Sequence, residues 1–151
     1  MVGESAPDFT LPATSGLEIT LSACRGGKVV LYFYPKDSTP GCTNESKDFR
    51  DLHEHFVAAG CTVFGISRDG LKSHDNFKAK QELPFDLISD KNETACEAYG
   101  VMKQKNMYGR QVRGIERSTF LIDADGRVAR EWRKVKVPGH AAEVLEAVRS
   151  R

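Results

Sequence analysis

Residues 29–43 read VVLYFYPKDSTPGCT, and this stretch decides the fold. Its first six residues, 29–34, are β-branched, apolar or aromatic and carry no charge, which is typical of a strand buried on both faces. Residues 39–41 then break the strand, and Pro40 is tolerated in the first turn of a helix. The pattern predicts a buried strand that leads directly into a helix, with Cys42 in the first turn.

The helix that follows is predicted to span residues 42–58, with Ser38 or Thr39 as its N-terminal cap. The charged residues along it, Glu45 among them, are assigned to the solvent side. Its apolar residues recur at helical spacing, at Phe49, Leu52 and Phe56. In the first turn, the Cys42 sulfur faces unpaired backbone N–H groups and the positive end of the helix dipole. Both favour the thiolate over the thiol.

The composition limits the kinds of protein to consider. With 151 residues, 40% of them hydrophobic, and no low-complexity stretch, we expect a single domain spanning residues 1–151. The net charge of +1 comes from 22 basic and 21 acidic residues spread evenly, so we expect no nucleic-acid or membrane partner. No apolar run reaches the length of a signal-peptide core or a membrane span, and a cytoplasmic protein is expected. The pattern shows no long exposed apolar patch, so a monomer is expected.

Four cysteines are scattered along the chain, at Cys24, Cys42, Cys61 and Cys96. Without a secretion signal, a framework of disulfides is not expected, and all four are predicted to be thiols. No two cysteines form a C-x-x-C pair. His53 and His55 lack the i, i+4 spacing that brings two imidazoles to one helical face. The sequence therefore predicts neither a metal site nor a cofactor.

The remaining elements alternate along the chain. A buried strand at 61–67 follows the first helix, and the two strands with the helix between them form a right-handed βαβ unit. Further strands are predicted at 17–22, 85–88, 118–123 and 128–133, and further helices at 71–81, at 92–99 and from His140 onward. The turn residues between the last two strands indicate a hairpin. The predicted fold is the three-layer α/β arrangement of thioredoxin-like proteins, with a mixed central sheet flanked by helices.

Pro35, Thr39 and Cys42 stand in the pattern Pro-x-x-x-Thr-x-x-Cys, which resembles the active-site signature of peroxiredoxins. Residues 34–43 are similar to the PrxQ subfamily in particular, whose members are also called bacterioferritin comigratory proteins. Further matches follow in the expected order: residues 6–12, residues 65–67 with 73–77, and residues 114–123. The resemblance covers nearly the whole chain.

The resemblance implies a thiol peroxidase that reduces hydrogen peroxide and small organic hydroperoxides to water or alcohol. Cys42 would be the peroxidatic nucleophile that becomes a sulfenic acid, with Thr39 and Arg117 completing the site and Pro35 shielding it. The Thr39 hydroxyl, the Cys42 backbone N–H and the Arg117 guanidinium are expected to donate to charge that develops on the peroxide oxygens. The reductant would be a thioredoxin, a glutaredoxin or a low-molecular-weight thiol.

The resolving cysteine is where this chain departs from its relatives. Many PrxQ proteins carry it five residues after the nucleophile or in the following helix, and here those positions are Lys47 and Lys78. The leading interpretation is a one-cysteine mechanism, in which an external thiol reduces the sulfenic acid through a mixed disulfide. The alternative is a two-cysteine mechanism resolved by Cys96 or Cys24, whereas Cys61 is interpreted as a buried core residue.

Other polar groups and other classes of function carry less weight. His74 and Asp75 resemble an acid–base pair, but at a helix start a capping role on a solvated face is favoured. A disulfide oxidoreductase would need a cysteine where Thr39 stands, and a redox sensor would lack catalytic turnover. A cluster of basic residues predicts an exposed loop that could dock an acidic reductase: Lys103, Lys105, Arg110 and Arg113.

Overall fold

The computed structural model describes all 151 residues and is built around a five-stranded mixed sheet. The strand order is β5-β4-β3-β8-β9, with bounds Leu87–Ser89, Cys61–Ser67, Lys28–Phe33, Ser118–Ile122 and Val128–Arg133. β3 pairs in parallel with β4, and β4 with β5, whereas β8 runs antiparallel to both β3 and β9. The strand that leads to Cys42 is therefore the central strand of the sheet.

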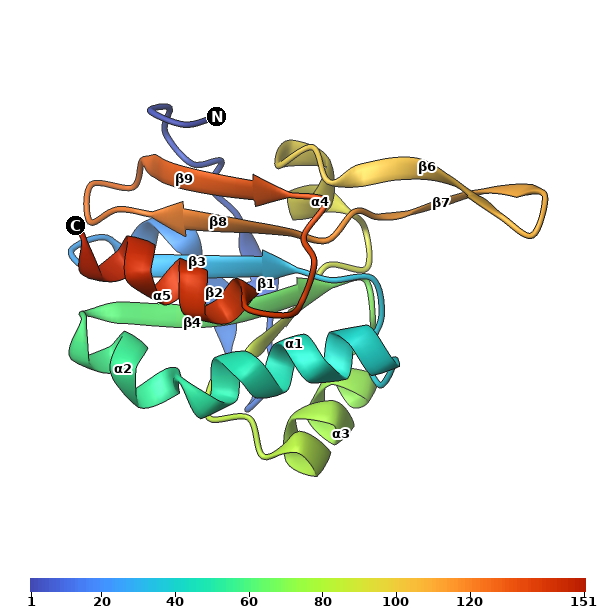
Figure 1. Ribbon diagram of the computed structural model, residues 1–151, viewed down its shortest axis with the longest axis horizontal. Helices are drawn as coiled ribbons and strands as arrows, with labels where there is room; N and C mark the ends of the chain where they lie inside the picture. Colours follow the sequence, from blue (N-terminus) through green and yellow to red (C-terminus); the bar gives the residue numbers. More distant parts are fainter.

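Helices and a small hairpin cover the two faces of the sheet (Figure 1). One face carries α1 (Pro40–Asp51), α2 (His53–Ala58), α3 (Leu71–Gln81) and α5 (His140–Arg149). The other carries the hairpin β1–β2 (Thr10–Pro12 and Glu18–Thr20), a 3-10 helix (Leu21–Cys24) and α4 (Thr94–Ala98). This is the expected three-layer α/β arrangement. None of the helices is both long and apolar enough to cross a membrane.

β3 separates two hydrophobic cores because its side chains alternate between the faces of the sheet. Leu31 and Phe33 lie in the core on the side of β1, β2 and α4. Val30 and Tyr32 lie in the core on the side of the four other helices, and Cys42 belongs to this second core. The uncharged run that the sequence shows is thus explained by burial on both faces.

The predicted elements are confirmed in type and order, but several bounds differ. The helix expected over 42–58 is two helices, because Leu52 leaves helical geometry, with φ −101° and ψ 2°. The strand expected over 17–22 is shorter, because the chain turns into the 3-10 helix after β2. β5 begins later and α4 is shorter than expected, and the sequence does not predict β1. No proline or glycine marks the break at Leu52, so the sequence pattern carries no signal for it.

The basic segment that was expected to be a loop is a β-hairpin that projects from the body of the protein (Figure 1). It consists of β6 (Met102–Met107) and β7 (Arg110–Ile115). Tyr108 and Gly109 join the strands with positive φ at both positions, as in a type I′ turn, and the Tyr108 side chain is 98% exposed. Arg113 forms ion pairs with Glu93 and Glu97 at the base of the hairpin. Polar side chains on both faces hide the strand alternation from sequence-based prediction.

Gly65 in β4 lies where no side chain fits. A Cβ atom there would come within 2.7 Å of Tyr32 Cζ and 2.8 Å of Leu87 Cδ2. We expect Gly65→Ala to lower the free energy of unfolding by about 1–3 kcal/mol, because Tyr32 must shift and strain its 2.9 Å hydrogen bond to Ser46 in α1. Urea unfolding measures this change. Gly27→Ala is the control, since its added Cβ would meet only a backbone carbonyl at 3.4 Å; equal losses in both variants would contradict the packing argument.

Candidate active site

Cys42 lies in the first turn of α1, directly after the loop that follows β3, and only 1% of its surface is exposed. Thr39 occupies the N-cap position, and Pro40 begins the helix. The first backbone hydrogen bond of the helix runs from the Thr43 N–H to the Thr39 carbonyl, so the Cys42 N–H has no acceptor within the protein. The predicted strand-to-helix junction is confirmed, and it places an unpaired backbone donor at the cysteine.

The Arg117 guanidinium reaches the sulfur from the segment between β7 and β8. Its Nη2 lies 3.4 Å from Cys42 Sγ, and its Nη1 donates to Glu45 Oε1 at 2.7 Å. Gly41 allows this approach, because a Cβ at that position would lie 3.2 Å from Arg117 Nη2. A fixed positive charge at this distance stabilises a thiolate.

Glu45 is buried, and the solvent-facing position expected for it is wrong. Its side chain is 1% exposed and pairs with Arg117. Because Glu45 stands three residues after Cys42, the two share a helical face, and that spacing is the signal that could have identified it. The second carboxylate oxygen, Oε2, has no hydrogen-bond partner. Burial raises the pKa of Glu45 to about 7, against the opposing effect of the Arg117 charge.

Thr39 and Pro35 lie in the segment between β3 and α1, and both are half-buried. Thr39 occupies the N-cap position, but its hydroxyl does not form the predicted capping bond. The hydroxyl donates instead to the Lys36 carbonyl at 2.8 Å. This bond directs the hydroxyl proton away from the helix and leaves the lone pairs of the oxygen free to accept. The predicted site residues therefore come from one short segment, one helical turn and the residues just before β8.

The other three cysteines stand apart from Cys42. Cys96 lies in the core on the opposite face of the sheet, and Cys24 packs against that core. Cys61 shares the core of Cys42 but lies at the start of β4, whereas Cys42 follows the far end of the adjacent β3. Burial raises the pKa of all three thiols, that of Cys61 to about 12, and Asp90 raises that of Cys96 further. All four cysteines are free thiols.

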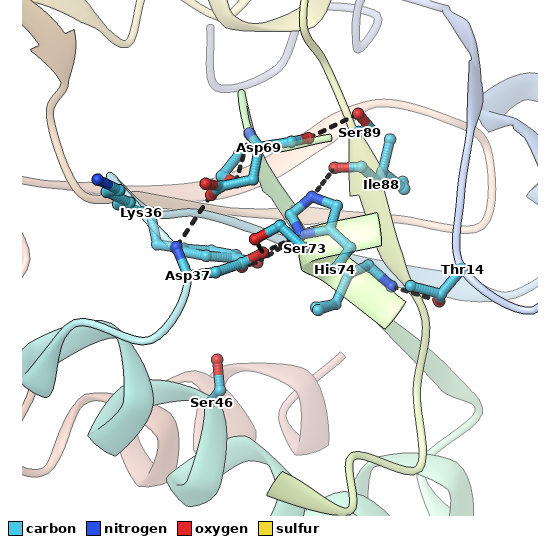
Figure 2. A network of polar contacts seen from close by, with 12 residues as sticks. Thr14, Lys36, Asp37, Ser46, Asp69, Ser73, His74, Ile88 and Ser89 are labelled. Atoms are coloured by element: carbon cyan, nitrogen blue, oxygen red, sulfur yellow. Dashed lines mark hydrogen bonds and ion pairs between the residues drawn. The ribbon is translucent and has the colours of Figure 1, made fainter. Parts of the chain in front are cut away.

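A buried polar network adjoins the loop before Cys42 (Figure 2). At its centre is His74, whose expected solvated position is wrong, since its side chain is completely buried. His74 Nδ1 lies 2.7 Å from Asp37 Oδ2, and Nε2 lies 3.0 Å from the Ile88 carbonyl. With Asp69, these side chains are close enough together to share a metal ion, but their ligand atoms are engaged in hydrogen bonds within the network.

Comparisons with known proteins identify relatives that match nearly the whole chain. The model of the AhpC/TSA family matches residues 2–131. Peroxiredoxin Bcp of Xanthomonas campestris is 54% identical over 143 residues, which are 95% of this chain and 89% of that protein. Peroxiredoxin Bcp of Bacillus subtilis is 48% identical over 148 residues, or 98% and 94% of the two chains. A solved structure of the X. campestris bacterioferritin comigratory protein is 51% identical, with a TM-score of 0.93, and covers 99% of this chain and 98% of that chain.

The fold and these relatives define a class, the thiol peroxidases built on a thioredoxin-like domain. The family match extends over most of the sequence, and the similar solved structures include PrxQ proteins of X. campestris and Xylella fastidiosa. The chain belongs to the AhpC/TSA family, within its PrxQ group of peroxiredoxins, as the resemblance in its motifs implied.

Replacing Glu45 by glutamine tests the cost of burying its charge. A carboxyl whose pKa rises from 4.5 to about 7 on folding takes up a proton, so its stabilising contribution is present below pH 4.5 and is lost as the pH rises to about 7. We expect the free energy of unfolding of the native chain to fall over this interval by on the order of 3 kcal/mol relative to Glu45→Gln. Urea unfolding at a series of pH values measures both proteins.

The matched control for this comparison is Asp51→Asn, which removes an exposed carboxylate from the same helix. Its stability should follow that of the native chain across the pH range. Parallel pH dependence in the native chain and Glu45→Gln would show that the pKa of Glu45 is not raised.

Proposed function

We propose that this chain reduces hydrogen peroxide and small organic hydroperoxides with the Cys42 thiolate as its nucleophile. The observation that carries the proposal is the 3.4 Å approach of Arg117 Nη2 to the buried Cys42 sulfur. Because so little of this sulfur is exposed, we expect it to react with a small oxidant in preference to a large electrophile. The related X. campestris protein has been studied for alkyl peroxide reduction, which supports the same class of substrate.

In the proposed reaction, the thiolate attacks the terminal oxygen of the hydroperoxide, so that an S–O bond forms and the O–O bond breaks. Cys42 becomes a sulfenic acid, and the leaving alkoxide or hydroxide takes up from solvent the proton that the Cys42 thiol lost when it ionised. Arg117 and the Cys42 N–H stabilise the negative charge on the reacting oxygens. Because the Thr39 hydroxyl donates its hydrogen bond to the Lys36 carbonyl, we assign its oxygen to accept a hydrogen bond from the hydroperoxide O–H rather than to donate one. Pro35 is assigned to shielding the site from water.

For the sulfenic acid we propose reduction by an external thiol. Cys96 and Cys24 lie on the other side of the sheet from Cys42, so a disulfide with either would require a large rearrangement. The two-cysteine mechanism with Cys96 or Cys24 is the second candidate, because both are free thiols. A thioredoxin, a glutaredoxin or a low-molecular-weight thiol each fits the one-cysteine route through a mixed disulfide.

We assign the docking of a protein reductant to the β6–β7 hairpin. The hairpin leads directly into the segment that holds Arg117, and no acidic residue lies within either strand. Its cationic side chains are Lys103, Lys105, Arg110 and Arg113. Arg113 pairs with Glu93 and Glu97, and the other three have no acidic partner in the chain. Lys105 Nζ donates to the Ile115 carbonyl, so Lys103 and Arg110 are the hairpin cations that favour a reductant with an acidic surface.

Charge reversal on the hairpin tests this assignment. We expect the double variant Lys103→Glu/Arg110→Glu to raise the KM for an acidic protein reductant about tenfold, and to leave turnover with dithiothreitol unchanged, because the small thiol needs no docking surface. Coupled turnover assays measure both. Lys80→Glu, a reversal at an exposed position on α3, is the control. Equal effects on the two reductants, or no effect on either, would contradict the assignment.

We further propose that the chain acts as a monomer in the cytoplasm, as one domain spanning residues 1–151. Helices and a hairpin from along the chain cover both faces of one central sheet, which supports a single domain. Large exposed apolar side chains are few relative to the buried ones, which supports a monomer. The evenly mixed charge favours neither a nucleic-acid nor a membrane partner.

One equivalent of hydrogen peroxide added to the fully reduced protein tests the proposed function. We expect the intact mass to increase by one oxygen within seconds, because Cys42 forms a sulfenic acid, and we expect no change in Cys42→Ser. Loss of two hydrogens would select the two-cysteine alternative, and peptide mapping would show whether Cys96 or Cys24 is joined to Cys42. An unchanged mass in both proteins would refute the peroxidase chemistry.

A further inference from the structure

The peptide unit between Lys36 and Asp37 links the Thr39 hydroxyl to a carboxylate. Its carbonyl accepts the Thr39 hydroxyl proton at 2.8 Å, and its N–H donates to Asp69 Oδ2 at 2.9 Å. Figure 2 shows the bond that joins Asp37 to Asp69. Because a peptide unit is planar and rigid, the carboxylate at one end constrains the residue of the proposed active site at the other.

Asp69 is itself held at the end of β4. The Ser67 hydroxyl donates to the same Oδ2 at 2.5 Å, and the Asp69 N–H donates back to the Ser67 oxygen at 3.2 Å. The Asp69 carbonyl accepts a third hydrogen bond, from the Ser89 hydroxyl, at 2.6 Å. The two bonds with Ser67 fix the carboxylate with Oδ2 directed at the Asp37 N–H, whereas the Ser89 bond reaches only the backbone carbonyl.

The Asp37 side chain fixes the same peptide from the other direction. It accepts hydrogen bonds from the Tyr34 hydroxyl at 2.6 Å and the Ser73 hydroxyl at 2.8 Å, and lies 2.7 Å from His74 Nδ1. His74 Nε2 faces the Ile88 carbonyl at 3.0 Å, so both ring nitrogens point at oxygen atoms. The Lys36–Asp37 peptide cannot rotate without breaking these contacts.

We propose that Asp69 is a positioning residue for peroxide reduction, and that it acts through the Lys36–Asp37 peptide and the Thr39 hydroxyl. The proposal rests on the function proposed above, since it requires Thr39 to accept a hydrogen bond from the hydroperoxide O–H. A carboxylate on the N–H polarises the peptide and makes its carbonyl a stronger acceptor. The Thr39 proton is then directed at Lys36, and the Thr39 oxygen presents its lone pairs to the hydroperoxide.

A double-mutant cycle between Asp69 and Thr39 tests this proposal. Asp69→Asn keeps the size of the side chain and an acceptor oxygen but removes the charge. We expect it to slow the oxidation of Cys42 by hydrogen peroxide about tenfold, and Thr39→Val to slow it on the order of a hundredfold. In the Thr39→Val background, Asp69→Asn should have no further effect, because the hydroxyl through which it acts is gone. Quenched-flow intact-mass measurements give the four rates.

Alkylation of Cys42 by iodoacetamide separates the positioning of Thr39 from damage to the thiolate. This reaction needs the thiolate but no acceptor for a hydroperoxide proton, so Asp69→Asn should alkylate at the native rate. Ser89→Ala removes a hydrogen bond to the backbone of Asp69 and leaves the carboxylate in place. It is the matched control, and its Cys42 should be oxidised at the native rate.

Three outcomes would overturn the proposal while leaving the proposed function intact. In the first, Asp69→Asn slows the oxidation of Cys42 equally in the native and Thr39→Val backgrounds. In the second, Asp69→Asn slows alkylation as much as it slows oxidation. In the third, Ser89→Ala slows the oxidation as much as Asp69→Asn does. By contrast, native-rate oxidation in Thr39→Val would remove Thr39 from the site. A native Cys42 that peroxide does not oxidise would refute the proposed function itself.

Discussion

The site depends on holding one positive charge against a sulfur that is removed from bulk water. Arg117 lies 3.4 Å from the Cys42 sulfur, a distance at which two unit charges attract by about 5 kcal/mol in a medium of effective dielectric constant about 20. Taking each charge out of water costs several kcal/mol, so this attraction alone leaves little surplus. The remaining stabilisation comes from the Cys42 N–H and the helix end, and both require the sulfur to stay in the first turn of α1.

The roles of Glu45 and Gly41 follow from this constraint. Glu45 holds Arg117 Nη1 while Nη2 points at Cys42, and Gly41 leaves the space through which the guanidinium approaches. An ionised Glu45 would compete with the sulfur for the charge of Arg117. Burial raises the pKa of Glu45 to about 7 and so weakens that competition. Burial disfavours the charged form of Glu45, so more of the Arg117 charge acts on the Cys42 sulfur.

The sequence predicts the parts of the site that depend on local chain geometry. The buried strand and the helix start at Pro40 follow from backbone propensities, and the structure confirms both. Glu45 and His74 escape the same reasoning, because polar residues of a helix are assigned to solvent unless a buried partner is known. Their partners are Arg117, 72 residues away, and Asp37, 37 residues away. Arg117 is found only through the resemblance of a motif, since nothing in its own neighbourhood marks it.

The first turn of α1 has to serve two opposed steps of the proposed cycle. Oxidation is favoured when the Cys42 sulfur stays in contact with Arg117. A protein reductant, by contrast, must reach the sulfenic sulfur at a position that is almost fully buried. This turn has no side-chain cap, because the Thr39 hydroxyl is bound to Lys36, and it contains Gly41. A missing cap weakens a helix by about 1 kcal/mol, and a glycine by about as much again. The hydrogen bond that prepares Thr39 for the hydroperoxide therefore also leaves the first turn of α1 less stable than a capped turn.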